Sequence, residues 1–182
     1  MSTFILEGPD GSGKTTLLEA LKAADSMLET VHPGKPPLSY PSLLAMLNAQ
    51  LTYNTPYRLV YDRVTCISEW VYRPFRVSIQ SDVENECAVY FSLLESQMTL
   101  ALHVKWPIIY CRPPVSKILA QCSQYNKNDT DATIKVVTDH IIDVVYRYDA
   151  LMARLELFGC KVIIFDYTRH STDEIIKSML EL

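Results

Sequence analysis

The sequence predicts a single doubly wound α/β domain, in which helices cover both faces of a parallel sheet. Two observations carry this prediction. The strongest strand candidates are short runs that are apolar throughout, as parallel strands buried on both faces are. Segments with helical periodicity separate these runs, as the crossover connections between parallel strands require. Ligands of such sheets bind beyond the carboxyl ends of the strands, so the loops there are where a site is expected.

Strands are expected where short apolar runs end at a glycine, a proline or a polar residue. The first run, residues 3–7, leads into a glycine-rich loop. A short strand is also expected in SMLETVHPGKPPLSYP, residues 26–41, ahead of its four closely spaced prolines. The other candidates are 57–62 (YRLVYD), 107–111 (PIIYC) and 161–165 (KVIIF). The expected sheet therefore has roughly five strands.

Helices are expected where apolar residues recur at spacings of three and four. The pattern is clearest over residues 132–158. Residues 67–76 are expected to begin a helix that breaks at Pro74, because proline cannot donate a helical hydrogen bond. A last helix is expected to be capped by Ser171 or Thr172. The remaining helical segments are 14–24, 42–51, 83–103, 115–122 and 172–180.

The bulk composition is that of an ordinary globular protein. Residues 1–182 are long enough for one domain, at 48% hydrophobic and 21% charged residues. Seventeen basic and 21 acidic residues give a net charge of −4, which argues against a general nucleic-acid binder but leaves room for one local basic groove. The five cysteines lack C-x-x-C spacing, which favours free thiols in a reducing compartment. Because no run approaches the length of a membrane span or resembles a signal peptide, a cytoplasmic location is expected.

Residues 8–15 (GPDGSGKT) match G-x-x-x-x-G-K-[ST] at every fixed position. Glycines let the backbone wrap around phosphates, and a strand before and a helix after complete the expected context. Lys14 should reach the β- and γ-phosphates of ATP, and Thr15 should hold Mg²⁺. The residues expected to contact the nucleotide are Gly8, Asp10, Gly11, Ser12, Gly13, Lys14, Thr15 and Thr16. The fold class is therefore that of the P-loop NTPases, a three-layer α/β/α arrangement, with 115–131 as a short lid-like segment.

A phosphate loop needs a second acidic group near the metal. Two apolar strands end in aspartate, at Asp62 and Asp166. Asp62 is followed at once by Arg63 and a helix start, whereas Asp166 belongs to what should be an outer strand. We therefore assign the catalytic and metal-binding role to Asp62. Asp166 either ends its strand or shapes a loop against the adenine.

Two other classes of nucleotide-binding protein fit less well. Residues 126–129 (NKND) match the guanine-reading N-K-x-D signature of GTPases, but they follow a helix instead of a strand. The D-x-x-G that a GTPase also needs occurs only inside the phosphate loop, at 10–13. A motor protein would need additional subdomains, for which the chain has no room. A small kinase remains.

Three stretches resemble thymidylate kinases. FILEGPDGSGKTT is similar to their N-terminus, with Asp10 at the position of their phosphate-loop carboxylate. VHPGKPP resembles their Arg-Glu-Pro-Gly loop, but has Val31 and His32 in place of the arginine and glutamate. YDRVTCISEWVY matches their Asp-Arg pair, and looks closer still to phage-encoded thymidylate-kinase-like proteins and deoxynucleoside kinases. The resemblance covers most of the chain but is specific only at these three places.

The resemblance implies transfer of a phosphoryl group from Mg-ATP to a deoxynucleoside monophosphate such as dTMP. It also implies a homodimer, since the related enzymes are often dimers, and the cytoplasm of a phage-infected bacterium. Arg63 would fork onto the acceptor phosphate, and Asp10 would accept a sugar hydroxyl. Alternative roles remain open: a surface ion pair with Asp62 for Arg63, and an exposed helix face for Glu69 and Tyr72. The residues expected to bind the acceptor are Asp10, Lys35, Arg63, Glu69, Tyr72 and Arg76.

The chain departs from the thymidylate kinase pattern in its catalytic arginine. Those enzymes carry one in the phosphate loop or the lid, whereas this lid-like segment holds only Lys117 and Lys127. Arg112, which follows PIIYC, either supplies the transition-state charge as a catalytic residue or forms the structural turn before two prolines.

Two alternative functions follow. One is a kinase for the hydroxyl of a hydroxymethylated pyrimidine in DNA, as in phage DNA modification, with Asp62 as the base that a hydroxyl acceptor needs. The other is a nucleotide-binding protein that has lost catalysis, which would bind ATP without turnover.

Overall fold

The computed structural model describes residues 3–34, 45–46, 49, 58–77, 106–125 and 138–180. The helix expected over 83–103 and the N-K-x-D match at 126–129 lie outside these residues, as does most of the helix expected over 42–51. The lid-like segment is described only as far as residue 125.

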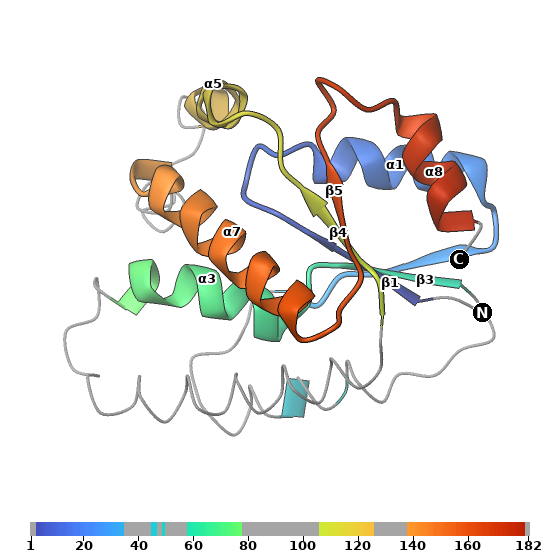
Figure 1. The fold of residues 1–182 in the computed structure, drawn as a ribbon, viewed down its shortest axis with the longest axis horizontal. Helices are drawn as coiled ribbons and strands as arrows, with labels where there is room; N and C mark the ends of the chain where they lie inside the picture. Colours follow the sequence, from blue (N-terminus) through green and yellow to red (C-terminus); the bar gives the residue numbers. More distant parts are fainter. Residues whose placement is uncertain are drawn as a thin grey trace.

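Five parallel strands form one sheet in the order β2-β3-β1-β4-β5, which confirms the predicted α/β class (Figure 1). The strands are β1 (Thr3–Glu7), β2 (Leu28–Val31), β3 (Arg58–Asp62), β4 (Ile108–Cys111) and β5 (Val162–Phe165). β1 lies at the centre and pairs with β3 and β4, with Leu6 in register with Asp62 and Glu7 with Tyr110. The carboxyl ends of these three strands therefore meet at one edge of the sheet.

Helices cover both faces of the sheet, with α1 and α8 on one face and α3 and α7 on the other (Figure 1). The helices are α1 (Lys14–Ala24), α3 (Thr65–Val77), α5 (Val115–Tyr125), α7 (Ile141–Leu157) and α8 (Thr172–Leu180). In Figure 1, α5 lies beyond the carboxyl end of β4 and not over a face.

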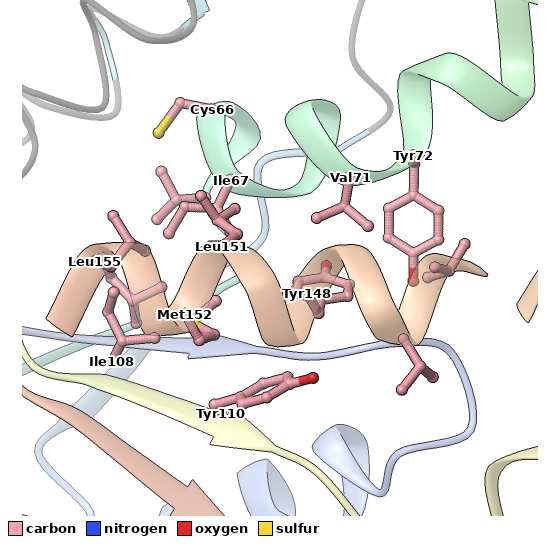
Figure 2. Close-up of a cluster of buried hydrophobic side chains, with 14 of the residues drawn as sticks. Cys66, Ile67, Val71, Tyr72, Ile108, Tyr110, Tyr148, Leu151, Met152 and Leu155 are labelled. Atoms are coloured by element: carbon pink, nitrogen blue, oxygen red, sulfur yellow. The ribbon is translucent and has the colours of Figure 1, made fainter. Parts of the chain in front are cut away.

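The central strands β1, β3 and β4 contribute alternate residues to two separate cores, which is why these runs are apolar. Phe4 and Leu6 join the core beneath α1 and α8, whereas Ile5 joins the core beneath α3 and α7. Figure 2 shows part of the latter core, where Tyr148 of α7 lies between Tyr72 of α3 and Tyr110 of β4.

Two helix predictions need correction. α3 begins at Thr65, earlier than expected, and continues through Pro74 to Val77. The long helix expected over 132–158 is interrupted at His140, after which α7 runs from Ile141 to Leu157. Apolar spacing cannot reveal a one-residue turn within a helical pattern.

The remaining boundaries fall close to the expected ones. β4 begins one residue after Pro107, whose carbonyl accepts the N–H of Ile5 at 2.9 Å. α5 extends to Tyr125, beyond the predicted end at residue 122. Ser171 is the cap of α8, as its Oγ accepts the N–H of Glu174 at 3.2 Å and the Glu174 carboxylate accepts the N–H of Ser171 at 2.9 Å.

The described cysteines are free thiols, and Cys66, Cys111 and Cys122 are buried. Within the described ranges, no helix has the length and apolar composition needed to cross a bilayer.

Candidate active site

The glycine-rich loop wraps from the end of β1 to the start of α1. Gly8, Gly11 and Gly13 all have positive φ, at 147°, 74° and 87°. A Cβ on Gly8 would lie 2.6 Å from the carbonyl oxygen of Cys111, so only glycine fits between the loop and β4. Gly13 precedes α1 without a side-chain cap, and the first turn of α1 holds no acidic residue. The first amides of α1 are therefore open to an anion.

Lys14 lies along this loop, where its Nζ donates to the carbonyls of Gly8 at 2.9 Å and Pro9 at 2.7 Å. The side chain is buried, and burial lowers the pKa of its ammonium group to about 8. Ser12 Oγ is also buried, and has no hydrogen-bond partner among the described residues. A polar atom of this kind inside a phosphate loop fits a site that a phosphate completes.

A pocket of about 700 Å³ opens over the loop. It brings together the phosphate loop, the end of β3, the middle of α5 and the loop from β5 to α8. All of the residues expected to contact ATP line it except Gly8, and so do Asp62 and Arg63. The remaining lining residues are Leu17, Gln121, Cys122, Thr138, Phe165, Tyr167 and Thr172.

Asp62, at the end of β3, and Thr15, in the first turn of α1, line the same pocket. Asp62 also pairs with His32, whose Nδ1 lies 3.0 Å from its Oδ2. The described residues contain no group of three or more His, Cys, Asp or Glu side chains that could cage a metal. Mg²⁺ usually binds one or two carboxylates together with substrate phosphates and water, so one carboxylate and one hydroxyl fit an ion held with a nucleotide.

Asp166 has a different environment, beside the edge strand β5. Its Oδ1 accepts the N–H of Thr168 at 2.9 Å and the Thr168 hydroxyl at 2.7 Å. Burial alone would raise the pKa of Asp166, but these hydrogen bonds and the nearby Arg169 charge hold it below the usual value. The contacts of Asp166 organise its own loop.

Arg63 adopts a left-handed backbone conformation, with φ of 72°. No other non-glycine residue of the described ranges has a positive φ. Its Nη2 contacts Oδ1 of Asp10 in the phosphate loop, and its guanidinium carbon lies 5.0 Å from the centre of the Tyr72 ring. The Tyr72 hydroxyl lies 3.4 Å from Arg63 Nη2 and accepts the N–H of Asp10 at 3.1 Å. Arg63 and Tyr72 therefore lie directly against the phosphate loop.

The other residues expected at the acceptor differ in position. Glu69 and Tyr72 are buried, so the alternative of an exposed helix face is wrong for both. Glu69 Oε2 lies 3.8 Å from Nη1 of Arg73, which is also buried. Lys35 and the side chain of Arg76 lie outside the described part of the chain.

Arg112 is engaged away from the pocket. Its Nε and Nη2 donate to the two carboxylate oxygens of Asp149 at 2.8 and 2.9 Å, and its Nη1 donates to the carbonyl of Pro113 at 2.9 Å. Asp149 also accepts the hydroxyl of Tyr110 at 2.7 Å. Of the two roles open for Arg112, these contacts favour the structural turn at the end of β4, and the predicted catalytic role gains no support.

Sequence reasoning missed Glu7 and Tyr167. Glu7 ends β1 without solvent exposure; its Oε1 accepts the N–H of Val64 at 2.7 Å and its Oε2 bonds the Tyr148 hydroxyl at 3.0 Å. Burial raises the pKa of Glu7 to about 7. The signal available in the sequence was an acidic residue closing an otherwise apolar strand. Tyr167 lies over the loop, with its ring 3.0 Å from where a Cβ on Gly13 would be.

Known proteins resemble this chain in fold. No family model and no curated protein matches the sequence. The YorR protein of Bacillus subtilis, solved in complex with phosphorylated GDP, superposes with a TM-score of 0.64 at 18% identity over 99% of this chain and 94% of that chain. Deoxyadenosine kinase from M. mycoides with bound dATP gives a TM-score of 0.64 at 12% identity over the whole of both chains. The same kinase with bound dCTP gives 0.63, again at 12% identity, over 100% of this chain and 99% of that chain. The fold is therefore shared with a deoxynucleoside kinase.

Proposed function

We propose that this protein is a kinase that transfers the γ-phosphoryl group of Mg-ATP to a deoxynucleotide, with a deoxynucleoside monophosphate such as dTMP as the preferred acceptor. One observation carries the proposal. The Arg63 guanidinium lies against the phosphate loop, in the same pocket as Lys14 and Thr15. A cation suited to an acceptor phosphate and a cradle suited to donor phosphates are therefore side by side.

The donor half of the site rests on the loop and α1. The open amides at the start of α1 and the Lys14 ammonium would bind the β- and γ-phosphates. Thr15 and Asp62 would hold Mg²⁺, which when bound supplies charge neutralisation at the phosphate oxygens. Tyr167 offers an aromatic face at the wall of the pocket beside Gly13, which supports the binding of a nucleobase.

The acceptor half rests on Arg63. A monophosphate is already anionic near neutral pH, so its oxygen needs no general base. A planar guanidinium can bind two phosphate oxygens at once, which lysine cannot. On binding, the acceptor phosphate would replace Asp10 as the partner of Arg63, and the Asp10 carboxylate could then accept a sugar hydroxyl. The acceptor oxygen forms a bond to the γ-phosphorus while the bond between the γ-phosphorus and the oxygen bridging it to the β-phosphate breaks. The products are ADP and a nucleoside diphosphate.

A second candidate is a kinase with a hydroxyl acceptor, either a deoxynucleoside or a hydroxymethylated pyrimidine in DNA. The observation that favours it is the pairing of Asp62 with His32, which holds a carboxylate in one orientation at the pocket wall. A hydroxyl acceptor needs such a base to take its proton. The M. mycoides neighbour is a deoxyadenosine kinase, which also favours a nucleoside acceptor.

Transfer of labelled γ-phosphate from Mg-ATP to a panel of acceptors tests these proposals. The panel holds the four deoxynucleoside monophosphates, their nucleosides, and DNA duplexes with and without hydroxymethylpyrimidine. Label on a monophosphate supports the first proposal, and label only on a nucleoside or on modified DNA supports the second. Tight ATP binding without label on any acceptor would contradict both and indicate a protein that binds nucleotide without catalysis.

Substitution of Arg63 by alanine tests the assigned acceptor contact. We expect the KM for the monophosphate to rise about 10- to 100-fold, the loss expected for a charge-assisted contact to phosphate, while the KM for ATP changes less than about threefold. Arg58→Ala is the matched control, because Arg58 begins β3, the strand that Arg63 follows, and also pairs with an aspartate, Asp25, at 2.8 Å. An unchanged acceptor KM in Arg63→Ala would contradict the assignment.

A further inference from the structure

We infer that Glu7 is a positioning residue, which orients the Arg63 guanidinium toward the acceptor phosphate by holding both the backbone and the aromatic support of Arg63. The inference rests on the proposed role of Arg63. Glu7 does not line the pocket and has no solvent exposure, so it acts only through other residues.

The first contact of Glu7 holds the backbone of Arg63. The Arg63 N–H donates to the carbonyl of Leu6 at 2.9 Å, and the next N–H, of Val64, donates to Glu7 Oε1 at 2.7 Å. Two hydrogen bonds to β1 therefore hold the backbone on both sides of Arg63, whose positive φ is unfavourable for any residue other than glycine. Without the carboxyl group, one of these two hydrogen bonds is lost.

The same contact fixes the start of α3. The carbonyl of Val64 accepts the N–H groups of Ile67 and Ser68, both at 3.0 Å, so Val64 stands immediately before the first turn of α3, and its own N–H donates to Glu7. An acidic group at a helix N-terminus is also favoured by the helix dipole. Tyr72 lies about two turns further along α3. The position of Tyr72 is therefore tied to the same carboxyl group.

The second contact of Glu7 supports the Tyr72 ring. Oε2 of Glu7 bonds the Tyr148 hydroxyl at 3.0 Å, and the Tyr148 ring meets the Tyr72 ring edge-on, with centroids 5.9 Å apart (Figure 2). The Tyr72 ring in turn lies beneath the Arg63 guanidinium. Glu7 thus reaches Arg63 by two routes, one through the backbone and one through two tyrosines.

A buried carboxyl group in the central strand is costly for stability, because it leaves water for an apolar surrounding. Burial raises its pKa to about 7, although Val64, Tyr148, Arg63 and Lys14 all act to lower it. The neighbouring residues of β1, Phe4, Ile5 and Leu6, are apolar and buried. A departure from the core pattern of this kind is expected where function requires it.

Two variants of Glu7 separate positioning from general structure. In Glu7→Gln the amide oxygen can still accept the Val64 N–H, so we expect an acceptor KM within about threefold of wild type. Glu7→Met keeps the volume but removes both contacts, and we expect the acceptor KM to rise roughly tenfold or more while the KM for ATP changes less than about threefold. A folded Glu7→Met protein with unchanged acceptor KM would overturn the inference, and so would parallel rises of both KM values.

A tyrosine pair provides the matched control, and decides the matter if Glu7→Met does not fold. Tyr148→Phe removes the hydroxyl that donates to Glu7 and should raise the acceptor KM about fivefold. Tyr110→Phe removes a hydroxyl of the same aromatic cluster that bonds Asp149 instead, at 2.7 Å, and should leave the acceptor KM unchanged. Equal effects of the two substitutions would overturn the inference.

A spectroscopic readout keeps this test separate from the proposed function. If wild type transfers phosphate to no acceptor, the proposed function has failed, but the NMR signal of the Arg63 Nε–H group still reports its position over the Tyr72 ring. In wild type and Glu7→Gln we expect the ring current of Tyr72 to change the chemical shift of this proton. In Glu7→Met we expect the chemical shift of a freely solvated arginine. Assignment by Arg63→Lys identifies the signal. An identical signal in all three proteins would overturn the inference.

Discussion

Three ionisable residues surround the phosphate loop: Glu7, at the end of β1, and Lys14, at the start of α1, are buried, and Arg63, which follows β3, is half-buried. Burial disfavours the charged form of each, which raises the pKa of Glu7 to about 7 and lowers that of Lys14 to about 8. Lys14 and Arg63 are oriented cations with limited access to water. A polyphosphate ligand would supply the negative charge that such a pair needs.

Glu7 predicts a specific pH dependence of stability. Its pKa is raised from 4.5 to about 7 on folding, so the folded state holds the proton more tightly than the unfolded chain. This contribution is complete below pH 4.5 and is lost as the pH rises through 7. We expect the free energy of unfolding to fall by about 3 kcal/mol across this window relative to Glu7→Gln, as measured by urea unfolding at several pH values. The charged and titratable groups around Glu7 are Lys14, Arg63, Cys66, Tyr72, Cys111 and Tyr148.

The two proteins share all other titrating groups. The difference between their free energies of unfolding at each pH therefore reports the titration of Glu7 alone. Parallel pH profiles for wild type and Glu7→Gln would contradict the raised pKa of Glu7.

At the scale of elements, α3 continues through Pro74 because another helix replaces the missing hydrogen bond. Pro74 has no N–H, so it cannot donate to the carbonyl of Trp70 four residues earlier. Arg147 of α7 fills this place: its Nη2 donates to the Trp70 carbonyl at 2.8 Å and its Nε to the Val71 carbonyl at 3.2 Å. Its guanidinium also lies 4.7 Å from the centre of the Trp70 ring. The helix that carries Tyr72 is thereby fastened to α7.

Substitution of Arg147 by alanine should therefore destabilise the protein by about 2 kcal/mol, because two carbonyls lose their donor and the stacking on Trp70 is lost. Pro74→Ala restores the N–H, so the same change in that background should cost at least about 0.5 kcal/mol less. Arg154→Ala is the control, since Arg154 of α7 is exposed and its guanidinium lies 5.8 Å from the centre of the Phe158 ring. This substitution should cost less than about 0.5 kcal/mol. Unfolding free energies of the single and double variants measure the coupling, and strictly additive values would contradict this explanation of α3.

At the scale of the whole molecule, the candidate site exists only because strands distant in sequence end together. The order β2-β3-β1-β4-β5 places the loop after β1 between the ends of β3 and β4. α5 closes over it, and Cys122 donates its thiol to the carbonyl of Asp10 at 3.4 Å. Elements from both halves of the chain thus share one pocket, so a ligand bound there should stabilise the molecule as a whole.

Mg-ATP should accordingly raise the melting temperature. At 100 times its Kd the nucleotide would add about 2.7 kcal/mol, or roughly 5 to 10 °C for a chain of this size. Lys14→Ala should abolish most of the shift, whereas Lys22→Ala, at the exposed far end of the same helix, should retain it. Thermal unfolding followed by circular dichroism gives the shift, and an equal shift in Lys14→Ala would contradict the assigned phosphate site.

Much of the fold was predictable from local patterns. Apolar runs and helical spacing identified the strands and most of the described helices, and the glycine loop with its flanking elements indicated where the candidate phosphate site lies. Asp62 and Arg63 could be placed at the same edge of the sheet as that loop because they follow a predicted strand, and parallel strands end at one edge. These features depend on spacings of a few residues, which a sequence displays directly.

The tertiary structure alone decided which groups meet across the chain. Glu7 and Tyr148 are 141 residues apart, Arg147 and Trp70 are 77 apart, and Arg112 and Asp149 are 37 apart. No local periodicity reports such pairs, so the role of Glu7, the passage of α3 through Pro74 and the engagement of Arg112 could not be predicted. The sequence by itself determined the layers of the fold and the phosphate loop, because backbone propensity and burial pattern are local properties. The partners of each buried charge were decided by packing, because the stability of a buried charge depends on whichever distant groups the fold brings to it.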